Sequence, residues 1–245
     1  MGNPNEPRCQ NLLNKSRVTR VISPRSGICY TYNMIRANDT EPKLLSYSAG
    51  VDFGLSLLVN LEAAYYMRYG LSESAGISVI ITPPGYSPQL IPVQYAIGPN
   101  TMTNLAIGSR NLTRKPAPYT SQCLNAYPAS LIKTDSSLKY LAYNEEECKS
   151  ACLIEYIQNK CHCIDPLLLE ARAVKDIPPE WSQSKFCPVG RKKPERECVH
   201  NYTVEYMIDP VGLAACPCQP ECTMQHYEVG FFNQIIFENK GNFFE

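Results

Sequence analysis

The stretch Tyr143-Asn-Glu-Glu-Glu-Cys-Lys-Ser-Ala-Cys-Leu-Ile-Glu-Tyr-Ile157 decides the fold that we expect for this chain of 245 residues. Asn144 can cap a helix whose acidic first turn, residues 145–147, complements the helix dipole. Cys148 and Cys152 are four residues apart, so their sulfurs should share one helical face about 6 Å apart along the axis. The sequence therefore predicts a helix that presents two cysteines in a row.

A second cysteine pair, Cys216-Pro-Cys218, has a matching spacing in a different conformation. Pro217 favours an extended backbone, in which residues two apart face the same way at roughly 6.6 Å. The helical pair and the extended pair can therefore be joined by two stacked disulfides. The spacing allows Cys148–Cys218 with Cys152–Cys216, or the reverse, and does not choose between them.

Residues 119–222 hold ten of the chain's 12 cysteines. A Cys123–Cys222 bond would tie the entry of this segment to its exit. Cys161 and Cys163 would pair with Cys187 and Cys198 in the loop that follows the helix. Each such bond contributes about 2–4 kcal/mol to stability. Zinc is the rival interpretation, but structural zinc favours C-x2-C pairs and both close pairs here are C-x-C, so we predict disulfides and no metal site.

Composition narrows the functional class. The formal net charge is zero, which offers no basic surface for nucleic acid. No G-x-S-x-G, Walker loop or H-E-x-x-H pattern occurs, so we predict neither an enzyme nor a cofactor. Beside so many cysteines, four N-glycosylation sequons indicate an oxidising, extracellular environment; they lie at Asn14, Asn38, Asn111 and Asn201. Because neither a signal peptide nor a membrane span is evident, we expect a fragment of a longer protein.

The cysteine order C…CxxxC-x8-CxC…C…C…CxCxxxC resembles the thumb of the degenerin, epithelial sodium channel and acid-sensing ion channel superfamily. Upstream, Gly27-Ile-Cys-Tyr-Thr-Tyr-Asn33 is similar to the family's G-x-C-Y-T-F-N, and Ala75-Gly-Ile-Ser-Val79 to its A-G-I-x-V. Phe53–Asn60 resembles its G-L-x-L-x-L-x motif, and Lys115–Tyr119 resembles the proline-aromatic run that opens the thumb. The resemblance covers about residues 20 to 225.

The resemblance implies one pairing of the thumb cysteines: Cys123–Cys222, Cys148–Cys218, Cys152–Cys216, Cys161–Cys198 and Cys163–Cys187. It also implies that Tyr119 lies at the wrist, where it couples thumb movement to the pore. Cys9 and Cys29 could pair with each other, but the resemblance implies that each bonds to a residue upstream of this chain.

We therefore expect an α+β extracellular domain fragment that lacks both transmembrane helices. It would combine an antiparallel central, palm-like sheet with a disulfide-stapled helical thumb. The expected parts are a finger-like segment at 1–26, a palm and β-ball region at 27–122, the thumb at 123–222 and a returning palm strand at 223–245. Within these parts we expect strands at 29–33, 53–61, 77–82 and 101–108, a proline-glycine loop at 83–100, a polar connection at 126–142, a helix at 167–173 and a basic loop at 190–196.

By resemblance, the protein is a subunit of an amiloride-sensitive sodium channel, a homo- or hetero-trimer in the plasma membrane with this region on the extracellular side. The pore that passes sodium ions, and the membrane helices, would lie in missing sequence. Acid-sensing members carry an Asp-Glu pair in the loop after A-G-I-x-V, but residues 82–88 here contain no carboxylate. Proton gating through that pocket is therefore not expected, whereas constitutive, mechanical or ligand gating stays open. The alternative function is a secreted cysteine-rich binding module without a pore.

Overall fold

The computed structural model of the chain divides into two compact units, which we describe separately. The first unit comprises the described residues of 1–43, 84–90 and 113–223, and the second those of 44–83, 91–112 and 224–245. The structure describes residues 18–23, 27–34, 44–61, 75–87, 94–115, 118–119, 122–166, 168, 186–188, 194–208 and 216–235.

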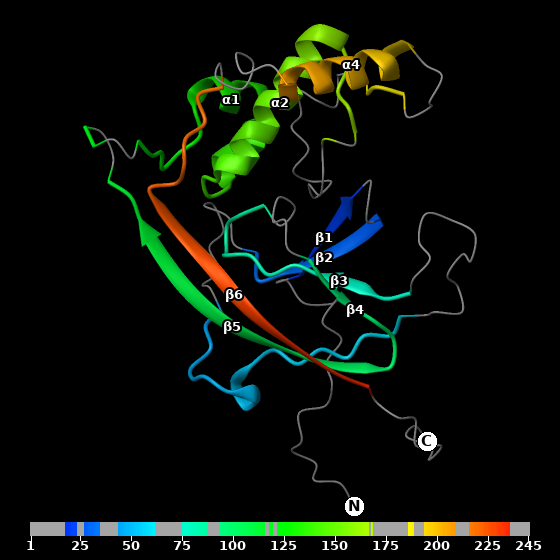
Figure 1. Ribbon diagram of the computed structural model, residues 1–245, viewed down its shortest axis with the longest axis vertical. Helices are drawn as coiled ribbons and strands as arrows, with labels where there is room; N and C mark the ends of the chain where they lie inside the picture. The colour runs from blue at the N-terminus through cyan, green and yellow to red at the C-terminus, as the bar shows by residue number, and fades with distance from the viewer. Residues whose placement is uncertain are drawn as a thin grey trace, which may run out of the picture. The chain divides into compact units, whose positions relative to one another are not determined.

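Helices dominate the first unit (Figure 1). The longest, α2 (Glu145–Cys161), begins where the sequence predicts, because the Asn144 side chain accepts a hydrogen bond of 3.1 Å from the Glu147 backbone N–H. It ends at His162, whose left-handed backbone lets its N–H donate to the Gln158 carbonyl. The other helices are α1 (Ala129–Thr134), the 3-10 helix η4 (Ser136–Tyr140) and α4 (Pro194–Ile208).

The core of the first unit forms around α2, which packs against α4 and α1. Leu131 and Leu138 from the short helices are almost fully buried, as are Cys148 and Ile157 on α2. Val199 on α4 closes the other side of this cluster. Because disulfide sulfurs share this core with aliphatic side chains, cross-linking and hydrophobic burial stabilise the same packing arrangement.

The described strands form three two-stranded sheets rather than one central sheet. In the first unit, β1 (Val18–Ser23) pairs with β2 (Gly27–Tyr32) in antiparallel register. In the second, β3 (Ile77–Val79) pairs antiparallel with β4 (Tyr95–Ile97). A Cβ on Gly76 would lie 2.5 Å from the Ile97 carbonyl oxygen, so the backbone of β4 approaches too closely for a side chain there.

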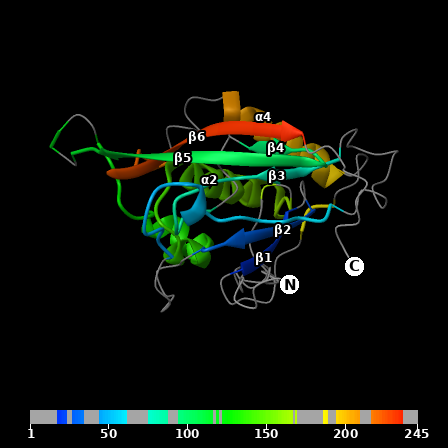
Figure 2. The same ribbon diagram turned by 90° about the horizontal axis from the view of Figure 1, so that it is seen from below.

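The long strands β5 (Thr101–Thr113) and β6 (Thr223–Ile235) lie side by side in both ribbon views (Figures 1 and 2). Their cross-strand contacts run in opposite directions: Thr103 hydrogen-bonds Asn233, while Ser109 accepts from Gln225. The pair is therefore an antiparallel ribbon. The expected mixture of helices, antiparallel strands and disulfides is confirmed in this form.

Several expected elements differ from the observed ones. Residues 54–61 form no strand; only the 3-10 helix η2 (Val51–Phe53) precedes them, and Leu58 is 84% exposed. The expected polar connection at 126–142 instead contains α1 and η4, because Leu131 and Leu138 supply apolar anchors to the core. Segment 1–26 contains β1, and the expected loop at 83–100 contains β4.

Residues 194–196 of the expected basic loop open α4, with Pro194 at its first position and acidic residues in its first turn. The expected helix at 167–173 lies outside the described residues, apart from Leu168. Of the described helices, none combines the length and the apolar character that crossing a bilayer would require.

Candidate functional site: the base of the disulfide-linked helix

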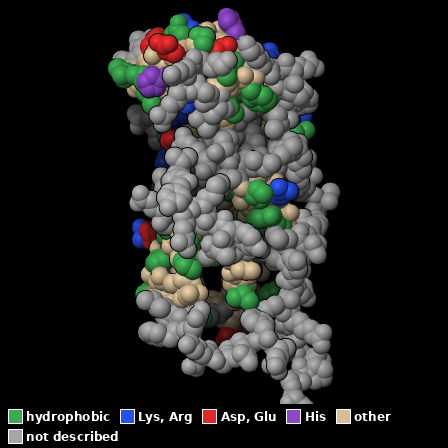
Figure 3. Space-filling model, turned by 90° about the vertical axis from the view of Figure 1, so that its right-hand side faces the viewer, with side chains coloured by type: hydrophobic (Ala, Val, Ile, Leu, Met, Phe, Trp, Pro, Cys, Tyr) green, Lys and Arg blue, Asp and Glu red, His purple; other side chains and the backbone are tan. Residues whose placement is uncertain are grey.

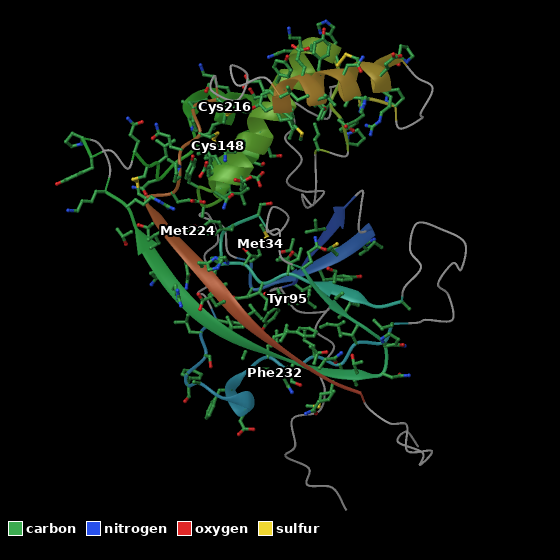
Figure 4. The ribbon with its side chains drawn as sticks, in the orientation of Figure 1. Met34, Tyr95, Cys148, Cys216, Met224 and Phe232 are labelled. Atoms are coloured by element: carbon green, nitrogen blue, oxygen red, sulfur yellow. A yellow bond between two sulfur atoms is a disulfide. The ribbon has the colours of Figure 1, made fainter. Side chains whose placement is uncertain are left out.

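Two stacked disulfides join α2 to the segment that leads into β6. Cys148 bonds to Cys218 and Cys152 to Cys216, with Cα–Cα distances of 5.7 and 6.1 Å. Figure 4 shows Cys148 and Cys216 close together on these two segments. Of the two arrangements that the spacing allows, this is the one in which the extended segment runs antiparallel to α2.

Three further disulfides hold both ends of the helical region. Cys123–Cys222, with a Cα–Cα distance of 4.9 Å, joins the two ends of the 123–222 segment. We call this end of the region, together with the N-terminus of α2, the base. At the far end of α2, Cys161–Cys198 and Cys163–Cys187 have Cα–Cα distances of 5.9 and 5.1 Å. Cys198 lies on α4 rather than in a loop. The five bonds join the same pairs that the family resemblance implies.

Backbone hydrogen bonds join the start of the 123–222 segment to its end. Leu124 and Glu221 form an isolated parallel bridge, in which the Leu124 N–H donates to the Pro220 carbonyl and its own carbonyl accepts from the Cys222 N–H. Arg114, directly after β5, donates its N–H to the Cys222 carbonyl at 2.7 Å. Its guanidinium Nη1 also donates to the Glu221 carbonyl at 2.8 Å. The end of β5 and the start of β6 are therefore fixed to each other.

Glu221 connects this junction to the N-terminus of α2. Its buried carboxylate accepts hydrogen bonds from the Asn144 side-chain amide at 3.0 Å and from the Glu145 backbone N–H at 3.1 Å. A carboxylate at a helix N-terminus is favoured by both the free N–H groups and the helix dipole. Glu221 thus caps a helix that begins 76 residues earlier in the chain.

Two buried tyrosines lock the segment that precedes α2. The Tyr143 hydroxyl donates to the Gln219 carbonyl at 2.5 Å and accepts from the Gln219 N–H at 3.1 Å. The Tyr127 hydroxyl donates to the Ala142 carbonyl and accepts from the Asn144 N–H. Their ring centroids are 5.0 Å apart. Burial raises the pKa of Tyr143, and the nearby Glu145 and Glu221 charges raise it further.

The loop at 82–87 adds a backbone contact to this base. Gly85 has a φ of 91°, which L residues rarely adopt, and its carbonyl accepts a hydrogen bond of 2.8 Å from the Ala142 N–H. Burial raises the pKa of Tyr86, and the charge of Glu221 adds to the effect. The loop therefore contributes a backbone carbonyl and a phenol to this base, and residues 82–87 contain no carboxylate.

The acidic first turn of α2 is paired with a cation from its own helix. Lys149 Nζ lies 2.7 Å from Glu145 and 3.2 Å from Glu146. The hydrogen bond to Glu145 raises the pKa of Lys149. This geometry fits carboxylates that complement the helix dipole and a lysine one turn away, so we assign no cation site to residues 145–147.

Among the residues that the structure describes, three cysteine sulfurs are close enough together to resemble a metal site. The Sγ atoms of Cys148, Cys216 and Cys218 all lie within 4.8 Å of one another. Metal binding requires thiolates, and all three sulfurs are bonded in disulfides. The arrangement therefore suits a covalent cross-link, and only reduction would convert it into a set of soft ligands.

The remaining predicted residues occupy varied places. Tyr119 is 54% exposed, and the Lys115 ammonium lies 4.9 Å from its ring centroid. Asn111 on β5 and Asn201 on α4 are exposed, as glycosylation would require. Cys29 packs against Val21 on the neighbouring strand. Cys9, Asn14 and Asn38 lie outside the described residues.

The sequence patterns did not point to the non-cysteine residues of the base, which are Arg114, Tyr127, Tyr143 and Glu221. No local period marks them, because their partners lie 15 to 107 residues away in the sequence. One signal was present. Glu221 stands between Pro220 and Cys222, inside the very cysteine framework that specifies the fold. Because Cys222 is cross-linked, the disulfide framework holds the neighbouring Glu221 carboxylate close to the N-terminus of α2.

Comparison with known proteins agrees with this architecture. The family model described as amiloride-sensitive sodium channel matches residues 2–243. The chain is similar to degenerin del-1 of Caenorhabditis elegans, with 28% identity over 166 residues, or 68% of this chain and 22% of that protein. It is similar to acid-sensing ion channel 1A of Danio rerio, with 24% identity over 213 residues, or 84% of this chain and 37% of that protein. It is also similar to degenerin mec-4 of Caenorhabditis briggsae, with 28% identity over 217 residues, or 86% and 24%.

The matched region therefore spans between 22% and 37% of the length of these three relatives. The family consists of ion channels and not of enzymes. Since the match extends over nearly the whole sequence, the chain belongs to the amiloride-sensitive sodium channel family.

Proposed function

We propose that this chain is the extracellular region of a subunit of an amiloride-sensitive sodium channel in the plasma membrane. The subunit would assemble as a homo- or hetero-trimer, with the sodium pore and the membrane helices outside this chain. The observation that carries the proposal is the hydrogen-bonded base in which Glu221 caps α2 while Arg114 joins β5 to β6. Family membership supports it.

In this proposal the disulfide-linked helices of 123–222 act as the thumb, and β5 with β6 belongs to the palm. The thumb would move as one body, because α2 is cross-linked to the rest of the region near both of its ends. A displacement of α2 would pull on Glu221, which is adjacent to Cys222 at the start of β6. The same displacement would reach the end of β5 through Arg114. A gating transition needs a rigid element that moves and elements that transmit the movement; here these would be the cross-linked helices and the strands β5 and β6.

Tyr119 would transmit this movement to the first membrane helix. Its ring is more than half exposed, and the Lys115 ammonium lies 4.9 Å from the ring centroid, a cation–π distance. Pro118 precedes it and restricts the backbone that presents the ring. An exposed, oriented aromatic ring is suited to contact another apolar surface.

Gating by protons at the 82–87 loop is not part of the proposal. This loop offers the Gly85 carbonyl and the Tyr86 phenol; phenols are ordinarily neutral at physiological pH, and burial raises the pKa of Tyr86 further. Without a like-charge carboxylate pair, mild acid has nothing to titrate at this position. The channel would be constitutively active or would open in response to mechanical force or an extracellular ligand.

The test is a voltage-clamp recording from cells that express the full-length subunit, with any partner subunits it needs. We expect a sodium current that amiloride blocks, and we expect Glu221→Ala to change its open probability or its kinetics. Glu197→Ala, at an exposed position of α4, is the matched control and should leave the current unchanged. A Glu221→Ala subunit that reaches the surface and gates like the parent would contradict the proposed coupling.

A further inference from the structure

Helix α4 carries apolar side chains on two sides. Val199 and Tyr206 are buried in the core of the first unit. Val204, Met207 and Ile208 instead face outward, with exposed fractions of 42%, 64% and 74%. Figure 3 shows hydrophobic side chains at the surface of the helical region, at the top of the view, among acidic side chains and histidines. Helices that are apolar on both sides are normally covered on both.

Asn201 lies on the same outward side of α4. It is exposed, and it precedes Val204 by three residues and Ile208 by seven, which is the spacing of one helical face. Along the axis these steps are about 4.5 and 10.5 Å. Helical side chains lean toward the N-terminus, so Val204 and Ile208 lean toward Asn201, while the Asn201 side chain leans toward the turn before it. The outward stripe formed by Val204, Met207 and Ile208 therefore starts beside this asparagine.

The sequence Asn201-Tyr202-Thr203 is a complete N-glycosylation acceptor. We propose that an N-linked glycan on Asn201 lies over the outward stripe and shields it from water and from other chains. The Asn201 Nδ2 would attack the anomeric carbon of a lipid-diphosphate-linked oligosaccharide. A nitrogen–carbon bond forms, the bond from that carbon to the diphosphate oxygen breaks, and the amide loses one proton. The bulky product places sugar C–H faces near the stripe and sugar hydroxyls in solvent.

A second copy of the chain fits the stripe less well. A stable protein interface buries about 800 Å² on each partner, more than three side chains at one helix end supply. Glu197 and Glu205 are also exposed on α4, so two such surfaces would bring like charges together. A covalently attached glycan requires neither a large area nor charge complementarity.

This inference rests on the extracellular placement proposed above, but not on ion conduction. The test begins with the chain secreted from eukaryotic cells, followed by peptide mass analysis at Asn201 and Asn111. We expect a glycan at Asn201. Modified Asn111 beside bare Asn201 overturns this inference alone, because the chain then reached the glycosylating compartment. If both are bare, this inference fails as well, because a secreted chain has passed through the glycosylating compartment whether or not its sequons are used.

Shielding is tested with two matched variants of the acceptor. Thr203→Ala abolishes the sequon and Thr203→Ser keeps it. We expect Thr203→Ala to increase the fluorescence of an apolar dye such as bis-ANS and to shift the chain to larger species in light scattering. Thr203→Ser should match the parent, and adding Val204→Ser with Ile208→Ser to Thr203→Ala should restore the parent values. If Thr203→Ala is not secreted, enzymatic removal of the glycan from the folded parent gives the same readout. Unchanged dye binding after complete deglycosylation overturns the proposal.

Discussion

The Asn144 side-chain amide donates a 3.0 Å hydrogen bond to the Glu221 carboxylate, joining the N-cap residue of α2 to the residue before the last cysteine of the framework. Asn144 Oδ1 also accepts from the Glu147 N–H, so this one side chain satisfies the helix end and reaches the exit of the region. The N-terminus of α2 is therefore held by side chains from two distant parts of the sequence.

Replacing Glu221 by alanine should lower the free energy of unfolding of the oxidised chain by about 1–3 kcal/mol, because two partly buried donors, the Asn144 side-chain amide and the Glu145 N–H, lose their acceptor. Glu221→Gln keeps an acceptor oxygen and should cost less. Denaturant unfolding followed by circular dichroism measures both. The exposed Glu197→Ala should stay within about 0.5 kcal/mol of the parent; equal losses for the two alanine variants would refute the cap.

The stacked disulfides should be mutually redundant. With one intact, removing the other opens only a small loop, so Cys148→Ser with Cys218→Ser, or Cys152→Ser with Cys216→Ser, should each cost about 2 kcal/mol. Removing both releases a much longer loop and should cost more than the sum of the two losses. Non-reducing denaturant unfolding of the three variants tests this. If the variant without both disulfides lost no more unfolding free energy than the sum of the two single losses, the two bonds would not close the same loop.

Two tyrosine-to-phenylalanine changes should differ in their effect on stability. The Tyr143 hydroxyl makes two hydrogen bonds to Gln219, so Tyr143→Phe should destabilise the chain by about 1–3 kcal/mol. The buried Tyr206 hydroxyl has no hydrogen-bond partner among the described residues, so Tyr206→Phe should be neutral or stabilising. Thermal unfolding of both variants beside the parent makes the comparison. A large loss for Tyr206→Phe would mean that its hydroxyl is satisfied.

Stability should fall at alkaline pH. Burial raises the pKa of Tyr143 and of Tyr206 above the ordinary value of about 10, so the folded state favours the neutral phenols. Their contribution is complete below about pH 10 and is lost as the pH rises through the raised values. Free energies of unfolding measured between pH 8 and pH 11 should therefore decline, and Tyr206→Phe should flatten the decline. If the dependence of stability on pH were the same in Tyr206→Phe as in the parent, burial would not raise the pKa of Tyr206.

What the sequence predicted well depended on local rules. Asn144 and the acidic turn after it predicted the start of α2 correctly, since capping involves residues only a few positions apart. The spacing of Cys148, Cys152, Cys216 and Cys218 predicted that two segments would be joined, but the order of joining depends on the relative direction of the segments. That direction is a tertiary property.

What the sequence predicted poorly depended on partners far along the chain. Residues 53–61 have strand-like composition, yet a strand exists only where another strand pairs with it, and no pairing forms along 54–61. The sequence does not predict α1, because a helix of six residues has little periodicity and its stability comes from burying Leu131. The base around Glu221 could not be predicted for the same reason.

We propose above that this chain is the extracellular region of a channel subunit. The most direct measurement is the sequence of the full-length transcript upstream of Met1 and downstream of Glu245. We predict an apolar span of about 20 residues on each side, as two membrane helices require. A cleavable signal peptide upstream, with a stop codon directly after Glu245, would contradict the claim and leave a secreted cysteine-rich binding module.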